Sequence, residues 1–99
     1  MDKREVIEKL NRYKILLAQN FKLDQLVLFG SYAKGSQHED SDIDVAVVVK
    51  SIDKDFFEYA PLLWKLRREI DDRIEPILIE RDNDKSGFLQ EVLRTGLII

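Results

Sequence analysis

The first twenty residues carry hydrophobic side chains with the period of a helix. These side chains recur at steps of three and four residues, at Val6, Ile7, Leu10, Tyr13 and Leu17. Lys14 is the one polar residue on this face. Asp2, three residues before Glu5, resembles the start of a capping box with aspartate as the cap. The pattern therefore predicts a helix that ends near Asn20.

Three segments, Leu23–Phe29, Asp42–Lys50 and Arg73–Ile79, have the composition of β-strands. The second is the clearest because its residues alternate between two faces. One face carries Ile43, Val45, Val47 and Val49, and the other carries Asp42, Asp44, Ala46 and Val48. Pro76 predicts an edge position for the third strand, since proline has no N–H to donate to a neighbouring strand.

Two more helices are expected, at about Ala60–Ile70 and Ser86–Thr95. Proline is tolerated in the first turn of a helix, so Pro61 sets the start of the first of them. Gly96 is the expected C-terminal cap of the second, and residues 97–99 follow as a short strand or an apolar tail. The order of elements predicts an α+β fold, with a mixed sheet that helices cover mainly on one face.

Size and composition narrow the class of protein. With 99 residues and 11.6 kDa, residues 1–99 are expected to form one domain. The net charge of −3, from 16 basic and 19 acidic residues, argues against direct nucleic-acid binding. The longest aliphatic run, Val45–Val49, is far shorter than the ~20 residues of a membrane helix, and the charged N-terminus is no signal peptide. Cysteine is absent, which excludes thiol chemistry. These features favour a cytoplasmic protein that does not contact membranes.

The junction Phe29-Gly30-Ser31 is a candidate phosphate site. Here a predicted strand meets glycine and serine and then a short turn or helix start at Ser31–Lys34. Such a junction offers backbone N–H groups, and the serine hydroxyl adds a donor. Taken alone, the same pattern is more often a strand-to-helix turn capped by serine.

Carboxylates form the second candidate feature. Asp42 and Asp44 lie on the same face of their strand, with Cα atoms about 6.5–7 Å apart, so their side chains can converge on one or two divalent cations. The alternative is a solvated strand start, but the apolar run after Asp44 is typical of a strand in a sheet interior. Glu75 alone would be interpreted as a surface or edge-strand glutamate.

Together these residues resemble a known signature. Gly30-Ser31, ten residues, Asp42, one residue and Asp44 is similar to the pattern of the polymerase-β-like nucleotidyltransferases. The segments 28–35 (LFGSYAKG) and 41–45 (SDIDV) look in detail like the minimal nucleotidyltransferase (MNT) family of the MntA-like antitoxin type. The resemblance implies a small polymerase-β-like nucleotidyltransferase domain.

The resemblance also implies a site. ATP or another NTP would be held through its phosphates at Gly30 and Ser31, with Lys34 as a further phosphate contact. Two Mg²⁺ ions, or Mn²⁺ as a substitute, would be held by the aspartates of the signature and by Glu75, at the place of the family's third carboxylate. The family usually has aspartate there, and the following Pro76 is unusual. Asp42, Asp44 and Glu75 are thus the catalytic and metal-binding candidates.

The implied activity is transfer of an NMP, AMP from ATP in the first instance, to a hydroxyl of a protein partner. MNT proteins are often paired with a HEPN-domain protein in toxin–antitoxin modules, so the chain is expected to be an antitoxin. The alternative is a binding-only antitoxin or regulatory subunit with little or no transferase activity, which the departure at Glu75 and Pro76 favours.

Trp64 marks a possible interface. It lies outside the helix face that is expected to cover the sheet, and an exposed tryptophan is typical of an interface anchor. A HEPN partner or a second copy of the chain would bind there; in the alternative, Trp64 packs on the last helix near Phe88 or on the loop at Phe56 and Phe57. Lys65, Arg67 and Arg68 are assigned to a solvated helix face.

Overall fold

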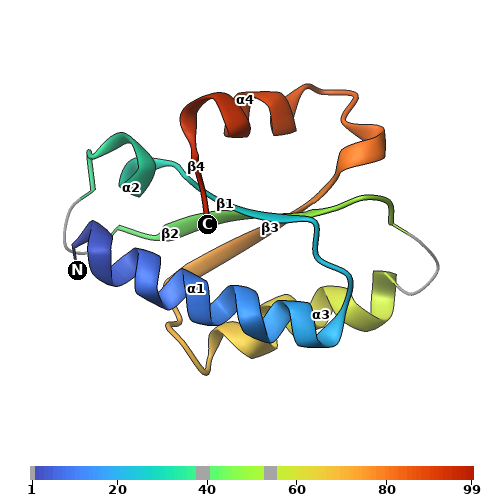
Figure 1. The fold of residues 1–99 in the computed structure, drawn as a ribbon, viewed down its shortest axis with the longest axis horizontal. Helices are drawn as coiled ribbons and strands as arrows, with labels where there is room; N and C mark the ends of the chain where they lie inside the picture. Colours follow the sequence, from blue (N-terminus) through green and yellow to red (C-terminus); the bar gives the residue numbers. More distant parts are fainter. Residues whose placement is uncertain (1, 38–40, 53–55) are drawn as a thin grey trace.

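A computed structural model describes residues 2–37, 41–52 and 56–99, and in it two helix layers enclose one sheet (Figure 1). The longer helices, α1 (Lys3–Asn20) and α3 (Phe56–Arg67), cover one face, and α4 (Phe88–Thr95) covers the other. The remaining elements are β1 (Gln25–Phe29), α2 (Ser31–Lys34), β2 (Ile43–Val49), β3 (Ile74–Glu80), a 3-10 turn (Arg81–Asn83) and β4 (Leu97–Ile98). The predicted α+β class, with helices mainly on one face, is confirmed.

The sheet is mixed, with strand order β3-β2-β1-β4. β1 runs antiparallel to both β2 and β4, and β2 runs parallel to β3. β3 is an edge strand, as Pro76 predicted. The register sets Phe29 of β1 opposite Asp44 of β2, and Asp44 opposite Glu75 of β3. Residues from three distant parts of the sequence therefore meet on adjacent strands.

The alternation along the strands divides the buried side chains into two clusters. The cluster under α1 and α3 is built from residues including Val6, Leu10, Leu17, Leu26, Leu28, Val45, Val47 and Leu63. The cluster under α4 contains Val27, Ala46, Val48, Ile79, Leu89 and Val92. Central strand β2 contributes to both clusters, as expected of a strand covered on both faces.

Helix α1 begins and ends where its periodicity predicted. The Asp2 side chain accepts a hydrogen bond from the Glu5 backbone N–H at 2.9 Å and so caps the first turn. Lys14, the polar residue on the apolar face, donates to the Ile99 carbonyl at 2.8 Å. The buried Tyr13 hydroxyl donates to the Leu63 carbonyl at 2.6 Å, which joins α1 to α3.

The expected bounds of the second long helix were wrong. It begins at Phe56 and not near Ala60, so Pro61 lies inside it, and it ends at Arg67, before Ile70. Pro61 is exposed, and the apolar face that follows it, with Leu63 buried, packs against α1 and the sheet. This burial outweighs the lost N–H donor. The chain then tightens into i→i+3 hydrogen bonds, such as Ile70 N–H to the Arg67 carbonyl at 2.9 Å.

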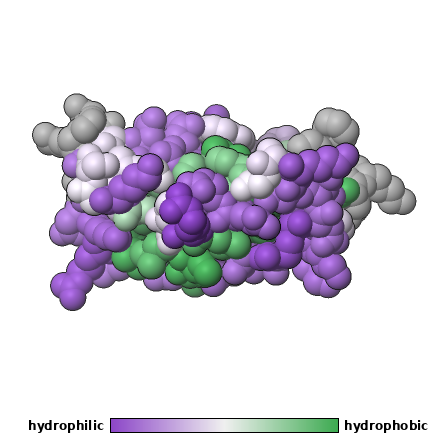
Figure 2. All heavy atoms as spheres, turned by 90° about the horizontal axis from the view of Figure 1, so that it is seen from above, coloured by the Kyte–Doolittle hydropathy of each residue, from purple (hydrophilic) through white to green (hydrophobic). Residues whose placement is uncertain are grey.

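Strand β4 closes the other edge of the sheet. Leu97 and Ile98 pair with β1 but remain 37% and 55% exposed. Figure 2, a view onto the α4 side, shows apolar surface gathered along one edge of this face, with charged side chains around it. Within the described segments, none of the helices is long and apolar enough to cross a membrane.

Gly96 ends α4 as predicted, but for a different reason. Its backbone is extended, with φ −92° and ψ 179°, so it needs no left-handed conformation. A Cβ at this position would lie 2.5 Å from the Val92 carbonyl oxygen and 2.7 Å from the Leu28 carbonyl oxygen. Glycine is required because the chain passes this close to two backbone groups as it turns from α4 into β4.

We expect Gly96→Ala to lower the free energy of unfolding by about 1–3 kcal/mol, because the added methyl forces α4 and β1 apart. Urea unfolding monitored by circular dichroism measures the loss. Gln90→Ala, on the exposed side of the same helix, is the control and should stay within about 0.5 kcal/mol of the parent. Equal stability of Gly96→Ala and the parent would contradict the close approach.

Candidate active site

The turn after β1 lies directly against a carboxylate. Gly30 has φ 73° and ψ −149°, a conformation that residues with a side chain rarely adopt. A Cβ on Gly30 would lie 2.4 Å from Oδ2 of Asp44. Glycine is thus needed twice, for its backbone angles and for the space that the Asp44 carboxylate occupies. The structure brings the candidate phosphate turn and the candidate metal ligand into contact.

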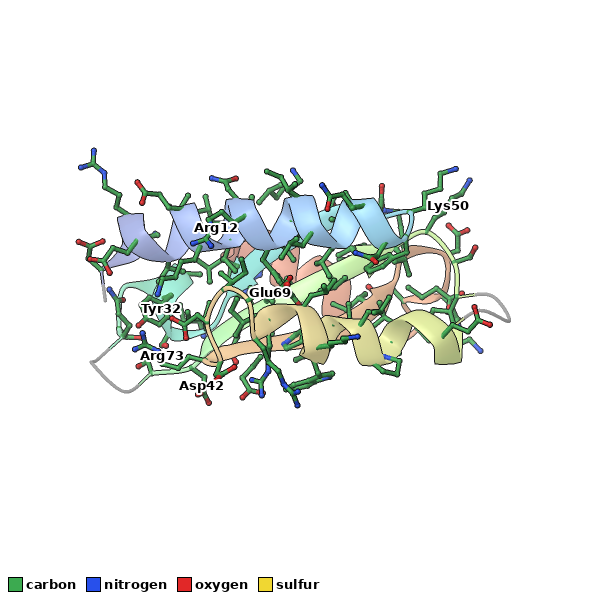
Figure 3. The ribbon with its side chains drawn as sticks, turned by 90° about the horizontal axis from the view of Figure 1, so that it is seen from below. Arg12, Tyr32, Asp42, Lys50, Glu69 and Arg73 are labelled. Carbon is green, nitrogen blue, oxygen red and sulfur yellow. The ribbon has the colours of Figure 1, made fainter. Side chains whose placement is uncertain are left out.

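The three predicted carboxylates lie at one end of the sheet. Asp42 immediately precedes β2 and is exposed, whereas Asp44 is half-buried inside the strand. Asp44 shares a face with Ala46, which packs under α4, and Glu75 is its register partner on β3. Figure 3 shows Asp42 near Arg73 at this end, while Lys50, just beyond the other end of β2, lies at the opposite end of the molecule.

The charges of this cluster oppose one another. Burial raises the pKa of Asp44 above its ordinary value, and the charges of Asp42 and Glu75 raise it further. A divalent cation would relieve that repulsion, and carboxylate oxygens are the donors that such cations prefer. The donor set fits a metal in this respect. Within residues 2–37, 41–52 and 56–99, however, no three acidic, histidine or cysteine side chains are already arranged to hold one, so the metal site stays a prediction.

The other two candidates lie on α2. Ser31 is its first residue and is half-buried, and its carbonyl accepts from the Ser36 N–H at 3.0 Å, which closes the turn. Lys34, at the end of α2, is exposed. A hydrogen bond from Arg94 is the main cause of a lowered pKa at Glu91, and the Lys34 charge contributes to the same lowering. Lys34 is therefore close to α4, and its predicted phosphate contact stays a prediction.

Sequence reasoning missed one residue, Arg67. It was assigned to a solvated helix face, yet its side chain is only 22% exposed and its Nη1 lies 3.9 Å from Oε1 of Glu75.

Trp64 is 42% exposed, and the Arg67 guanidinium lies over its ring, 4.6 Å from the ring centroid. The alternative that places Trp64 near Phe88 was wrong, because the Phe88 ring packs edge-on against Phe29, 5.8 Å between centroids, on the other face of the sheet. The alternative that places Trp64 on Phe56 and Phe57 stays a prediction. The feature of the sequence that could have revealed the contact of Arg67 was its spacing from Trp64, which lies one helical turn away.

A cavity of about 610 Å³ lies elsewhere. It is bounded by Phe21, Leu23, Val49 and Leu62, with Lys22 and Lys50 at its rim. This is the Lys50 end of the molecule, opposite the carboxylates (Figure 3). The candidate active site is accordingly the surface at the start of β2 rather than this cavity.

Comparisons with known proteins agree with the fold. The protein adenylyltransferase MntA of Thermococcus cleftensis is 31% identical over 96 residues, which cover 91% of this chain and 88% of that protein. A solved structure from Sulfolobus solfataricus has a TM-score of 0.71 over 97% of this chain and 80% of its own, and at 19% identity it shows the same fold.

A crystal structure of the toxin–antitoxin with AMP-PNP has 27% identity and a TM-score of 0.60, over 99% of this chain and 72% of its own. The family model described as polymerase beta, nucleotidyltransferase matches residues 9–99. The resemblance drawn from the motifs is confirmed. The chain is an MntA-like nucleotidyltransferase and belongs to the polymerase-β nucleotidyltransferase family.

Proposed function

We propose that the protein transfers AMP from ATP to a hydroxyl of a protein partner, with the help of divalent cations. The observation that carries the proposal is the contact of the Gly30 turn with Asp44, which has Glu75 as its neighbour on β3. This contact supports the proposal because the turn that we propose to bind phosphate lies beside carboxylates that repel one another, and a divalent cation would relieve that repulsion. The protein adenylyltransferase relative supports AMP as the transferred group.

Each residue has a separate task in this proposal. Gly30 and Ser31 bind the β- and γ-phosphates and orient the pyrophosphate leaving group. Asp42, Asp44 and Glu75 would hold Mg²⁺, or Mn²⁺ in its place. When bound, such ions neutralise the phosphate charge and polarise the α-phosphate toward attack.

The reaction itself is an in-line displacement. The acceptor oxygen forms a bond to the α-phosphorus as the bond between that phosphorus and the α–β bridging oxygen breaks. Pyrophosphate leaves with the bonding electrons, and Glu75 takes the proton of the acceptor hydroxyl. The half-exposed position of Glu75 leaves it open to an acceptor that arrives from solution.

The proposed partner is a HEPN-domain toxin, with this chain as its antitoxin. The toxin–antitoxin neighbour supports a partner of that kind. The exposed Trp64 on α3 offers an anchor for it, or for a second copy of the chain, on the helix next to Glu75. A tyrosine of the partner is the proposed acceptor.

The alternative, a binding-only antitoxin, also has an observation in its favour. Glu75 replaces the usual aspartate and forms an ion pair with Arg67, and the carboxylates as placed are not convergent. A protein of this kind would form the complex and leave the partner unmodified.

The test is incubation of the purified chain and its HEPN-type partner with Mg²⁺ and ATP labelled at the α-phosphate. We expect label on the partner, none with Asp42→Asn, and transfer about 10- to 1000-fold slower with Ser31→Ala, which loses one preorganised donor. Intact-mass analysis should show one added AMP. A stable complex that stays unlabelled would establish the binding-only alternative.

Gly30→Ala should abolish most of the transfer, by about 100-fold or more, because its methyl displaces the Asp44 carboxylate. Gly87→Ala is the matched control. Gly87 also has a positive φ, 74°, but no atom lies within 4 Å of its added Cβ. Gly87→Ala should lose about 1–2 kcal/mol of stability from its left-handed backbone. Gly30→Ala should lose more, because its backbone angles are essentially restricted to glycine and its methyl also meets Asp44, and only Gly30→Ala should lose activity. Equal transfer rates for the two variants would contradict the role of the Gly30–Asp44 contact.

Asp44→Asn should stabilise the metal-free protein in a pH-dependent way. Because the pKa of Asp44 is raised in the folded state, stability falls as pH rises from the ordinary value of 3.8 through the folded pKa. The asparagine variant has no such loss, so its excess free energy of unfolding should grow over this window and then level off. Urea unfolding from about pH 3 to about pH 7 measures it, with the exposed Asp82→Asn as control. A difference that does not change with pH would contradict the raised pKa of Asp44.

A further inference from the structure

Arg67 is held in one place by three contacts. Its Nη1 donates to the Asp72 carbonyl at 2.5 Å and to the Ile74 carbonyl at 2.9 Å. The Trp64 ring lies 4.6 Å from its Cζ, within the range of a cation–π contact. Arg67 thus bridges the end of α3, the turn that follows and the first residue of β3. Its guanidinium is a fixed positive charge, since arginine does not deprotonate in proteins.

The guanidinium of Arg67 extends past the edge of the sheet toward a side chain on the other face. Arg67 belongs to the helix layer under one face, whereas Glu75 shares its face of β3 with Ile79, which packs under α4. The two meet because β3 is an edge strand, so nothing in the sheet lies between α3 and the outer side of β3. Nη1 of Arg67 and Oε1 of Glu75 are 3.9 Å apart.

Glu75 needs such a neighbour more than an aspartate would. Its side chain is one methylene longer than that of the family's usual aspartate and is 39% exposed, so it has more rotamers to lose on binding. Asp44 repels it from one side. Arg67 attracts it from the other side at ion-pair distance, while both protons of the Arg67 Nη1 are donated to the carbonyls of Asp72 and Ile74.

We propose that Arg67 is a positioning residue for Glu75, and that it sets the third carboxylate for the divalent cation and the acceptor. The proposal rests on the proposed function. Partners that hydrogen-bond to a metal ligand typically change metal affinity by about 10- to 100-fold, and an ion pair at 3.9 Å is expected at the lower end of that range or below it. If Arg67 acted only through its charge, its removal would change the cation affinity in the opposite direction, because the loss of a positive charge beside the site would tighten the binding of a cation.

The experiment measures Mn²⁺ affinity, in the presence of AMP-PNP, by electron paramagnetic resonance. We expect Arg67→Ala to weaken Mn²⁺ binding by up to about 10-fold, since Arg67 contacts Glu75 through an ion pair. Arg67→Lys should lose a similar factor, because a lysine cannot bind two carbonyls in the arginine geometry while it faces Glu75. Arg68→Ala, which removes the exposed arginine next in sequence, is the control and should bind as the parent does.

A double-mutant cycle separates positioning from a general structural role. In a Glu75→Ala background, Arg67→Ala should cause no further loss of Mn²⁺ affinity, since the residue through which it acts is gone. An undiminished loss in that background would overturn the proposal, and so would equal or tighter binding by Arg67→Ala in the parent. If Arg67→Ala does not fold, Arg67→Lys carries the same cycle, since it keeps the charge and most of the side chain.

The result also separates this inference from the proposed function. If the parent binds Mn²⁺ with AMP-PNP and the Arg67 variants bind equally well, the positioning role fails and the metal site stands. If the parent binds no Mn²⁺ under these conditions, both fail.

Discussion

The site depends on the pairing of β2 with its two neighbours. β2 pairs with antiparallel β1 on one side and with parallel β3 on the other, and its register with both strands determines which side chains meet. The register with β1 brings the Gly30 turn to Asp44, and the register with β3 brings Glu75 beside it. A slip of one residue would turn the carboxylates to the other face, under α1 and α3. The side chains of β2 are apolar on both faces, so the charge of Asp44 opposes the slip, because a slip would bury that carboxylate under α1 and α3.

The same arrangement lowers the stability of the fold at a residue that the proposed chemistry requires. The core would be served equally well by an apolar side chain at position 44, whereas the carboxylate brings desolvation and the repulsion of two neighbours. The chain tolerates this because the burial of residues on both faces of β2 is extensive and the charged cluster lies at the strand's start. Residues that carry a strained or repulsive arrangement beyond what the fold requires are often those that function selects.

The sequence predicted most of the fold where local period and burial agree. Helix α1 and strand β2 have regular patterns, so their limits were found to within a residue or so. Helix α3 was placed too late because Pro61 is a local signal, and the packing of Leu63 against α1 is a tertiary one that outweighs it. For Gly96, the glycine was identified correctly and its reason was not, since contact with the Leu28 carbonyl depends on how β4 meets β1.

The candidate site was predicted in a similar way. Spacing, together with the resemblance to a family signature, singled out Gly30, Asp42 and Asp44 as candidates, but no spacing reveals that the glycine touches the Asp44 carboxylate. Arg67 was overlooked because charged residues at the end of a helix are usually solvated. Its contact with Glu75 exists only because α3 lies under an edge strand.

The outer side of β3 has a consequence for the assembly of the protein. In this strand the backbone groups of Ile74 and Pro76 face away from β2, since the intervening residues pair with it. Pro76 has no N–H to offer there, and the Ile74 carbonyl is already taken by Arg67. A further strand therefore cannot be added along this part of the edge, from a second copy or from a misfolded chain. The proline and the arginine together protect the sheet against edge-to-edge aggregation while the end that carries the carboxylates stays open.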